Sequence, residues 1–513
     1  MNSPLLALWF LLFAPFLYAW RRIKQVRRQQ RQNRTKLLDE LGVTLADAHR
    51  KRVVGFFHPY CNAGGGGERV LWTAIEHMQR TERDVVCAVY SGDTDATKAS
   101  IIEKVKARFD ISLAPDSLAF VFLNSRHLVE DSTWPRFTLL GQSLGSMYMA
   151  WEAMGKLIPD LFIDTMGYAF TFHVVRWIGR VPIGAYVHYP TISTDMLARV
   201  RARQRWHTNA DTISASRVLS LGKVLYYRIF MYHYSRSLRL ASFVMVNSSW
   251  TKNHVDAILR HSDPLLDALH TLPPWSLLNW ISPANADSPR DARIVYPPCD
   301  TREVAQFPLQ GRERVILSLA QFRPEKDHAA QLHAFSILLD AHPEFKSSGA
   351  SPIRLVLVGS SRNAEDAARV DSLRALATAL DIADQVEFVL NAPFATVLHW
   401  LSRASVGLST MVDEHFGINV VEFMAAGVIP VTHASGGPLN DIVVPFNGEP
   451  TGYHATTPES FAEALYSAFT LAPEQELAMR ERARTWAVQR FSEEEFEKGW
   501  DASGWRTWLE AGS

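Results

Sequence analysis

Short apolar runs alternate with longer segments of helical periodicity along most of the chain. In the first half these runs predict strands at residues 52–58, 84–90, 118–123, 161–164, 183–188 and 242–247. In the second half they predict strands at residues 315–319, 353–358, 386–390, 406–409 and 429–432. Strands that alternate with helices are typical of a parallel, doubly wound sheet. The pattern therefore predicts an α/β protein with two Rossmann-like halves.

The alternation breaks between about residues 257 and 293, where five prolines interrupt it, and resumes after Tyr296-Pro297-Pro298. We therefore expect an N-terminal domain over residues 45–290 and a C-terminal domain over residues 291–485. Two such halves facing each other would form a cleft. Ligands in these folds bind at the carboxyl ends of the strands, so the loops that follow the strands are the places to look for a site.

The first 36 residues form a separate segment. Residues 4–20 are apolar, and residues 21–36 carry eight Lys and Arg and no acid. Seventeen apolar residues are close to the shortest stretch that spans a bilayer. A cleaved signal peptide would carry its charge before the apolar run and small residues after it, whereas here Tyr18 and Trp20 end the run. Residues 1–36 are thus predicted to be a retained transmembrane helix with a basic flank, and the positive-inside rule places the body of the chain in the cytosol.

Composition narrows the class of protein further. The chain of 513 residues has 53 basic and 53 acidic side chains, and this balance argues against a general nucleic-acid binder. Hydrophobic residues at 47% and charged residues at 21% are typical of a globular protein. Cys61, Cys87 and Cys299 are too few for a disulfide framework and lack the spacing of metal ligands, which indicates a reducing compartment.

The first candidate site is a glycine run, Gly64 to Gly67, between the first predicted strand and a helical pattern. A strand, a glycine loop and a helix together present backbone N–H groups and a helix dipole to an anion. Glu68 and Arg69 follow the run, so it matches neither the P-loop pattern nor G-x-G-x-x-G, and both a P-loop ATPase and a dinucleotide oxidoreductase lose support. A merely flexible turn is the alternative interpretation.

The strongest candidate lies in the second half, where Glu414 and Glu422 are separated by seven residues. If a helix begins near Phe416, Glu414 lies in the loop at its positive end and Glu422 about two turns along. Free N–H groups at that end suit a diphosphate, and the two carboxylates can accept hydrogen bonds from sugar hydroxyls. The alternative is two solvated glutamates of an ordinary amphipathic helix.

Two further motifs carry charge near the strand ends. Arg323 and Lys326 follow the first strand of the second half and could clamp a pyrophosphate, although charges at a helix start would look similar. Asp93-Thr94-Asp95 has the D-x-D spacing that supports a divalent cation in other sugar-nucleotide enzymes. It lies in the other half, and Arg323 and Lys326 already supply positive charge, so a loop or acceptor contact is favoured over a metal.

These segments together resemble the retaining GT-B glycosyltransferases of the group 1 type, which carry the same spacing of two glutamates. More narrowly, they are similar to the α-1,2-mannosyltransferases of the dolichol-linked oligosaccharide pathway. The blocks that carry this resemblance are residues 58–72, His188 to Ser193, Tyr296 to Cys299 and Glu414 to Ile418. The resemblance implies a GT-B fold in which the N-terminal domain takes the acceptor, the C-terminal domain takes the donor, and residues 486–513 pack back on the first domain.

The resemblance also implies the substrates. Mannose would pass from GDP-mannose, with retention and in α-1,2 linkage, to the dolichol-pyrophosphate-linked trimannosyl-chitobiose, adding the fourth and fifth mannoses on the cytosolic face of the endoplasmic reticulum for protein N-glycosylation. No cofactor and no metal is expected. The expected partners are GDP-mannose, the lipid-linked oligosaccharide and the membrane, with other mannosyltransferases of the pathway left open and no nucleic acid.

The same resemblance implies roles for individual residues. His188 lies beside the reacting sugar and Glu414 contacts it, while Glu422 contacts the ribose. The other donor-binding residues are the closing loop Gly65, Gly66 and Gly67, the diphosphate ligands Arg323 and Lys326, and Phe416, Gly417 and Ile418 at the helix start. For His188, a purely structural role at a strand end is the alternative.

Two other functions stay open at this point. One is a retaining GT-B enzyme with a different nucleotide sugar or lipid acceptor, and the other is a catalytically silent GT-B scaffold subunit. Residues 221–240 mix aromatic and basic side chains in a way that suits an anionic membrane surface. Residues 147–178 are apolar but are interrupted by charges, so ordinary core is favoured there over a second membrane span.

Overall fold

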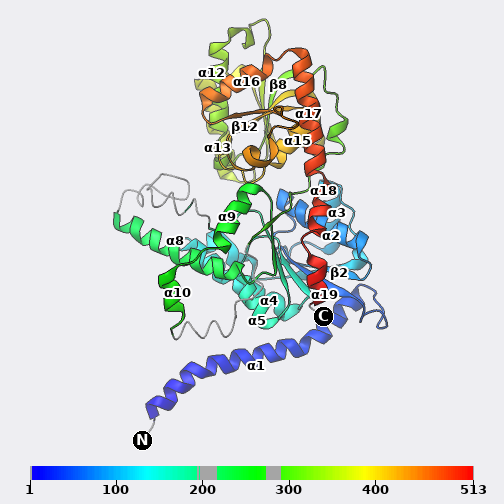
Figure 1. Cartoon of the computed structure of the whole chain (residues 1–513), viewed down its shortest axis with the longest axis vertical. Helices are drawn as coiled ribbons and strands as arrows, with labels where there is room; N and C mark the ends of the chain where they lie inside the picture. The colour runs from blue at the N-terminus through cyan, green and yellow to red at the C-terminus, as the bar shows by residue number, and fades with distance from the viewer. Residues whose placement is uncertain (1–2, 193–195, 197–216, 273–290, 512–513) are drawn as a thin grey trace. The chain divides into compact units, whose positions relative to one another are not determined.

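The computed structural model describes residues 3–192, 196, 217–272 and 291–511. The chain divides into two compact units (Figure 1). The first comprises Met1–Val246, Lys252–Ile294 and Trp500–Ser513, and the second comprises Asn247–Thr251 and Val295–Gly499. Each unit is built around its own sheet.

The first unit contains a seven-stranded sheet in the order β3-β2-β1-β4-β5-β6-β7. All of its strand pairs are parallel, as the alternating pattern predicted. The six strands expected from the apolar runs are present, and the two-residue β7 was not predicted. The strands are β1 (Arg52–Phe57), β2 (Val85–Ser91), β3 (Leu118–Phe122), β4 (Leu161–Asp164), β5 (Ile183–Val187), β6 (Phe243–Val246) and β7 (Arg293–Ile294).

Helices cover this sheet and bury its apolar side chains, because a parallel sheet with helical crossovers has both faces in the core. Strands β2 and β5 are buried along their whole length. The helices are α1 (Ser3–Glu40), α2 (Gly66–Thr81), α3 (Lys98–Phe109), α4 (Thr138–Lys156), α5 (Thr171–Ile178), α8 (Arg217–Leu238), α9 (Ser249–Leu259), α10 (Pro264–His270) and α19 (Trp505–Ala511). Helix α4 packs against α5, and α5 also contacts α8.

The second unit has a six-stranded parallel sheet in the order β10-β9-β8-β11-β12-β13. Its strands are β8 (Glu313–Leu319), β9 (Arg354–Gly359), β10 (Val386–Leu390), β11 (Ala404–Ser409), β12 (Ile429–His433) and β13 (Tyr453–Ala455). Its helices include α12 (His328–Ala341), α13 (Ala364–Ala379), α14 (Phe394–Arg403), α15 (Ile418–Ala426), α16 (Pro458–Phe469), α17 (Pro473–Phe491) and α18 (Glu493–Asp501). The five predicted strands are confirmed, and β13 was missed.

Helix α1 is continuous through the apolar run and the basic flank, and its second half packs on the first unit. The Arg27 guanidinium donates to the carbonyl of Ile178 at 2.8 Å, and Arg34 forms an ion pair with Asp160 at 2.8 Å. Part of the basic flank is therefore bound by the body of the protein. Within the described residues, no helix is both long and apolar enough to cross a membrane. The side chains of residues 3–16, 18 and 19 lie outside the described part, so the anchor stays a prediction.

The C-terminal segment returns to the first unit only from Trp500 onward, whereas α17 and most of α18 belong to the second unit. Trp500 is fully buried, and its ring stacks on Phe56 at 6.3 Å between ring centroids. His77 of α2 lies 2.9 Å from Asp501, which adds a polar contact to this packing. The predicted final domain, 486–513, is thus divided between the two units.

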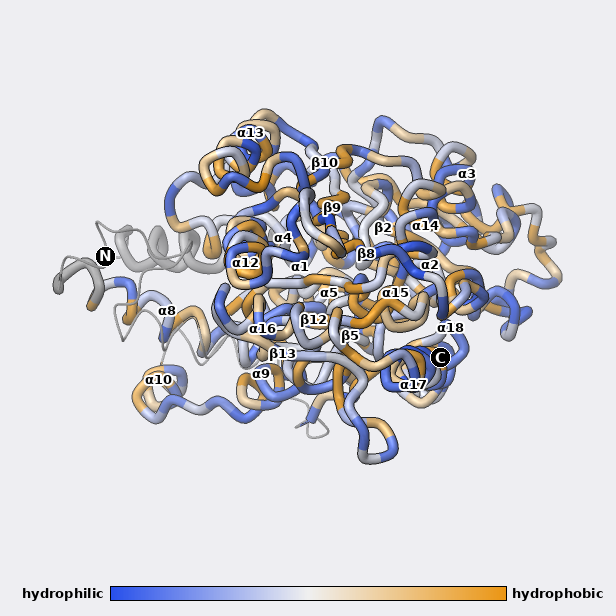
Figure 2. The backbone as a smooth tube through the Cα atoms, turned by 90° about the horizontal axis from the view of Figure 1, so that it is seen from above, coloured by the Kyte–Doolittle hydropathy of each residue, from blue (hydrophilic) through white to orange (hydrophobic). Residues whose placement is uncertain are grey.

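Hydrophilic and hydrophobic residues follow one another along helix α8, as Figure 2 shows. Its aromatic side chains are mostly buried, among them Tyr227, Phe230 and Tyr234. Leu221, Leu225 and Ile229 are exposed instead. The helix therefore places aromatic rings in the core and leaves an aliphatic strip on the surface.

Candidate functional site

The loop after β8 carries the predicted diphosphate ligands in the second unit. It forms a short 3₁₀ turn, Pro324–Lys326, before α12 begins at His328. The hydroxyl of Thr410, just past β11, lies 3.0 Å from the carbonyl oxygens of Lys326 and Asp327. This contact holds the two loops together at the carboxyl edge of the sheet, where ligands of such folds bind.

Lys326 and Glu414, which are 88 residues apart in the sequence, form an ion pair in this loop cluster. Their Nζ and Oε2 atoms are 2.5 Å apart, and the side chains are 22% and 13% exposed. Arg323 lies at the same turn, 3.7 Å from Glu325, and is more exposed at 39%. The structure therefore places Lys326 in an ion pair with Glu414, while the Arg323 side chain remains accessible to solvent.

Helix α15 begins at Ile418, two residues later than predicted, because Gly417 takes a left-handed conformation with φ of 115°. Glu422 consequently lies about one turn into the helix, rather than two. The Asn419 side chain donates to the carbonyl of Leu319 at 3.1 Å, which fixes the helix start against the end of β8. The first N–H groups of α15 lack helical partners and can bind an anion in this loop cluster.

Phe416 and Ile418, predicted to bind the donor, contribute their side chains to the core. The Phe416 ring is only 3% exposed and lies 5.8 Å from the Tyr296 ring and 5.5 Å from the Phe491 ring. Ile418 packs against the same hydrophobic cluster. These two residues can reach a ligand through their backbone, and their side chains hold the loop in place.

In the first unit, polar side chains lie close together at the carboxyl ends of β1, β4 and β5. His58 follows β1, and its Nδ1 lies 2.7 Å from the hydroxyl of Thr165, which follows β4. Burial, together with the nearby His188, lowers the pKa of His58 to about 3, so this imidazole is neutral at physiological pH. His188 follows β5 and is half-buried, so its ring lies at the margin of the core.

The glycine loop lies next to His188. Helix α2 starts at Gly66, and a Cβ atom added at Gly67 would lie 3.4 Å from Nε2 of His188. The buried Glu68 carboxylate accepts a hydrogen bond from the N–H of Gly65 at 2.6 Å, which closes the turn, and burial raises its pKa. In the sequence, Glu68 stands out only as a departure from known glycine-loop motifs. Its position three residues after Gly65 is the capping-box spacing that could have identified it.

Asp164 is a second buried acid that no sequence motif marks. It ends β4 and is fully buried, and its Oδ1 accepts a hydrogen bond from the N–H of Met166 at 3.0 Å. Its Oδ2 has no hydrogen-bond partner among the described residues. Burial raises the pKa of Asp164 to about 7, against the smaller opposing effect of backbone N–H groups.

The D-x-D element is already engaged within the protein. Asp93 is buried and forms an ion pair with Arg126, while Asp95 is exposed. Within the described ranges, no three His, Cys, Asp or Glu side chains are grouped so that they could hold a metal ion. Cys61, Cys87 and Cys299 are all buried, and none of them is in a disulfide bond with another.

Comparison with known proteins agrees with this geometry. Residues 51–259 match the family model described as ALG11 mannosyltransferase N-terminus, and residues 300–486 match the one described as Glycosyl transferases group 1. The GDP-Man:Man(3)GlcNAc(2)-PP-Dol alpha-1,2-mannosyltransferase of Xenopus laevis is 43% identical over 461 residues, which cover 89% of this chain and 88% of that protein. The chain belongs to this family of α-1,2-mannosyltransferases.

Other relatives and structures are consistent with this membership. The human mannosyltransferase of the same name is 43% identical, with 88% of this chain and 87% of that protein covered. Sucrose-phosphate synthase from Thermosynechococcus elongatus aligns with a TM-score of 0.57, 16% identity, and coverage of 90% of this chain and 100% of that one. At such low identity this likeness shows the GT-B fold alone. The chain is thus a GT-B mannosyltransferase with two parallel-sheet, Rossmann-like units.

Replacing Gly436 by Ala is expected to displace the Glu414 loop of this mannosyltransferase. A Cβ atom at Gly436 would lie 2.2 Å from the carbonyl oxygen of Glu414, and φ at this residue is 63°. We expect kcat/KM for mannose transfer to fall about tenfold, since a small misplacement of a positioned group costs rate. Steady-state kinetics at varied donor concentration measures this.

Gly448→Ala is the matched control, because φ at Gly448 is also positive, at 83°, but nothing lies within 4 Å of the added Cβ. Both variants carry the backbone strain of a left-handed residue, about 1–3 kcal/mol. Only Gly436→Ala moves the loop. Equal kcat/KM values for the two variants would contradict the displacement.

Asp164→Asn is expected to change how stability depends on pH. The pKa of Asp164 is raised on folding, so its favourable contribution is complete below its ordinary value near 3.8 and is lost as the pH rises to about 7. The asparagine variant has no such group. The unfolding free energy of the variant minus that of the wild type should therefore increase between pH 4 and 7, by an amount on the order of a few kcal/mol.

The difference between the two proteins is the quantity to measure, because His58 has the opposite effect in the same pH range. Its lowered pKa makes stability rise as the pH increases from about 3 toward its ordinary value near 6.5. Urea unfolding at several pH values, with both proteins in parallel, isolates the contribution of Asp164. If the difference in unfolding free energy between variant and wild type stayed constant across this range, Asp164 would not take up a proton on folding.

Proposed function

We propose that this protein transfers mannose from GDP-mannose, in α-1,2 linkage and with retention, to a dolichol-pyrophosphate-linked trimannosyl-chitobiose. The family membership supports this proposal, because the relatives' name specifies the same donor, acceptor and linkage. The observation that carries it is the Lys326–Glu414 pair, 2.5 Å apart in the loops beside the start of α15. This arrangement presents a cation and N–H groups for a diphosphate, and a carboxylate for sugar hydroxyls.

We assign Lys326 and Arg323 to the donor diphosphate, Glu414 to the transferred mannose and Glu422 to the ribose, while the backbone of residues 416–418 faces the donor. These donor roles rest on the family's pattern. Lys326 already pairs with Glu414, so a bound diphosphate would share this cation with the carboxylate. In this way donor binding and sugar orientation are coupled.

In the first unit we assign His188 to the reacting sugar, and Gly65, Gly66 and Gly67 to the loop that closes over the donor. In the proposed reaction the acceptor hydroxyl oxygen bonds to C1 of mannose while the bond from C1 to the phosphate oxygen breaks. The proton passes from the acceptor hydroxyl to a phosphate oxygen of the leaving GDP. No metal is needed for this balance, since Arg323 and Lys326 supply positive charge at the leaving diphosphate.

The test is transfer of labelled mannose from GDP-mannose to the lipid-pyrophosphate trimannosyl acceptor by the purified full-length protein, with and without EDTA. We expect a product that EDTA does not reduce and that an α-1,2-mannosidase digests. Competition by GDP but not by UDP would separate this function from a GT-B enzyme with another nucleotide sugar. No transfer by the folded protein would overturn the proposal and favour a scaffold subunit.

We also propose that the protein acts at the endoplasmic reticulum membrane, held by the apolar residues 4–20, with both units in the cytosol. The apolar run with its following basic flank supports this orientation. Deletion of residues 4–20 is expected to move the protein from the carbonate-resistant membrane fraction to the supernatant while leaving the contacts of Arg27 and Arg34 intact. Unchanged membrane retention would assign the anchoring to another segment.

A further inference from the structure

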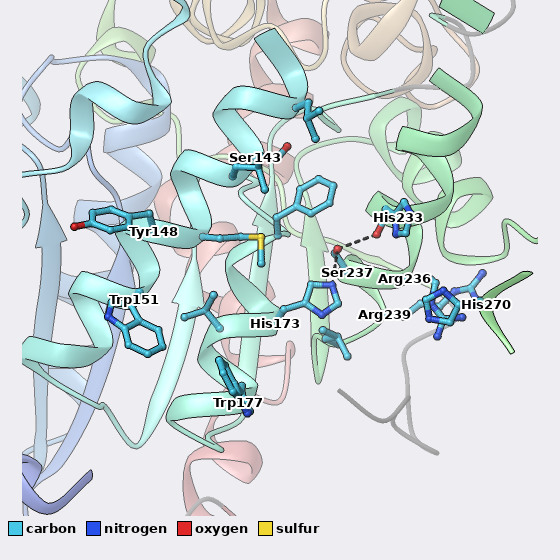
Figure 3. A pocket seen from close by; sticks show the side chains of 16 residues that line it. Ser143, Tyr148, Trp151, His173, Trp177, His233, Arg236, Ser237, Arg239 and His270 are labelled. Atoms are coloured by element: carbon cyan, nitrogen blue, oxygen red, sulfur yellow. Dashed lines mark hydrogen bonds between the residues drawn. The ribbon is translucent and has the colours of Figure 1, made fainter. Parts of the chain in front are cut away.

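The first unit contains a groove whose lining residues have no role in the assignments above. It has a volume of about 610 Å³ and lies between α4, α5 and α8, with His270 of α10 at one end (Figure 3). Cavities of this size accommodate a small ligand or a segment of a longer one. The groove is lined by Leu140, Ser143, Leu144, Met147, Tyr148, Trp151, Phe170, His173, Val174, Trp177, His233, Arg236, Ser237, Arg239, Leu240 and His270.

One end of the groove is apolar and open to solvent. Tyr148 and Trp151 of α4 and Trp177 of α5 lie at this end in Figure 3. Leu144 and Tyr148 are 55% and 60% exposed, and Leu140 beside them is also exposed. Exposed apolar side chains gathered along one hollow mark a binding surface for an apolar ligand.

The other end carries two guanidinium groups and two imidazoles, those of Arg236, Arg239, His233 and His270 (Figure 3). Burial lowers the pKa of His233, so the positive charge comes from the arginines. The His233 and His270 ring centroids are 6.5 Å apart. Asp267 of α10 also lies near Arg239 and accepts a hydrogen bond from the Tyr232 hydroxyl at 2.9 Å. Arg236 and Arg239 bring two permanent positive charges to this end of the groove, which favours an anion.

His173 lies between the two ends of the groove. Its Nε2 lies 2.9 Å from the hydroxyl of Ser237. Burial, followed by the charges of His233, Arg236 and His270, lowers the pKa of His173 to about 4. An imidazole kept neutral beside cationic groups can donate or accept a hydrogen bond without adding charge.

Helix α8 links this groove to the strand end that carries His188. Tyr234, one residue from His233 in the sequence, accepts a hydrogen bond through its hydroxyl from the N–H of Thr191 at 3.3 Å. Phe170, which lines the groove, lies 6.2 Å from the Tyr234 ring. One helix thus contributes to a wall of the groove and supports the loop that follows His188.

An apolar channel that ends at two arginines fits an amphiphile with an anionic head. We propose that this groove binds the lipid-linked acceptor, with isoprene units of its chain along α4 and α5 and its diphosphate at Arg236, Arg239 and the two histidines. The inference rests on the proposed function, which supplies a lipid diphosphate as the substrate. The acceptor named for the relatives carries several sugar residues between its diphosphate and the reacting mannose, so a lipid site distinct from His188 is expected.

The direct test is photolabelling of the full-length protein with an isoprenyl diphosphate that carries a diazirine on its terminal isoprene unit. We expect the label in peptides covering residues 138–178, and we expect unlabelled isoprenyl diphosphate to displace the probe. Labelling elsewhere would overturn the proposal. Equal displacement by phosphatidic acid vesicles would also overturn it, because the groove would then take any anionic lipid.

A matched pair of variants tests the apolar end. Leu144→Glu introduces a charge into the groove, while Leu265→Glu changes a leucine of α10 that is 58% exposed and does not line it. We expect Leu144→Glu to raise KM for the lipid-linked acceptor at least fivefold, with KM for GDP-mannose unchanged. Leu265→Glu should change neither constant by more than twofold. Equal acceptor KM values for the two variants would contradict the assignment.

The basic end is tested by Arg236→Gln, with Arg236→Lys as the variant that restores the charge and Arg260→Gln as an exposed control outside the groove. Arg236→Gln should weaken displacement of the photoprobe by the unlabelled diphosphate at least fivefold, and Arg236→Lys should recover most of it. If Arg236→Gln weakened displacement of the photoprobe no more than Arg260→Gln does, Arg236 would not bind the diphosphate. Because probe binding is scored without GDP-mannose, failure of the groove and failure of the mannosyltransferase activity give different results.

Discussion

Replacing Glu414 by Gln is expected to lower kcat for mannose transfer at least a hundredfold, which corresponds to about 3 kcal/mol in the activation free energy. The carboxylate pairs with Lys326 at 2.5 Å, and both side chains are largely removed from solvent. Gln keeps the size of the side chain but loses its charge, so Lys326 is left without a charged partner and is free to move. The proposed hydrogen bond to the sugar changes from a charged acceptor to a neutral one, which is weaker.

Glu344→Gln is the control for this prediction, because Glu344 lies on the surface of the same unit, 3.5 Å from His342. Its kcat should stay within about twofold of the wild type. The double variant Lys326→Met, Glu414→Gln should lose much less than the product of the two single losses, since the two residues act as a pair. Wild-type kcat in Glu414→Gln would show that this residue does not hold the donor.

Replacing Trp500 by Ala should lower the unfolding free energy of the first unit by about 3–5 kcal/mol, the usual cost of removing a large buried aromatic ring. The ring is fully buried and stacks on Phe56 at 6.3 Å and on Tyr186 at 6.5 Å. Its loss leaves a cavity between the sheet and the C-terminal segment. The midpoint of the first urea transition, followed by tryptophan fluorescence, measures this effect.

Trp508→Ala provides the comparison, because Trp508 lies in the same C-terminal segment but is only half-buried. We expect a loss of about 1 kcal/mol or less for it. Trp500→Phe should lie between the two, since it restores part of the stacking on Phe56. If Trp500→Ala were as stable as Trp508→Ala, the C-terminal segment would not be holding the first unit together.

Much of the fold could be predicted from the chain because its signals are local. The apolar runs predicted eleven of the strands, and β7 and β13 were missed because two or three residues are too few to form a recognisable run. The start of α15 was predicted two residues early, since Gly417 takes a left-handed conformation with φ of 115° directly before the helix. Sequence periodicity does not report the backbone conformation of a single glycine.

The candidate site could be predicted in part. Glu414 and Lys326 were selected from their positions after strands, but the ion pair between them joins loops 88 residues apart. The ring of Phe416, a residue predicted at the donor site, lies in the core beside Tyr296, which the sequence pattern did not indicate. Asp164 gave no signal, because a single acid at the end of a strand looks the same whether it is exposed or fully buried.

By itself the sequence determined the alternation of strands and helices, the glycine loop and the family resemblance, because each of these depends on residues that are neighbours along the chain. The tertiary structure alone decided that Arg27 and Arg34 of the basic flank contact the body of the protein, and that Trp500 packs on Phe56. It also created the groove, whose apolar and basic walls come from helices far apart in sequence. The physical reason is that burial and electrostatic fields depend on which side chains are close together in space, and the fold determines this.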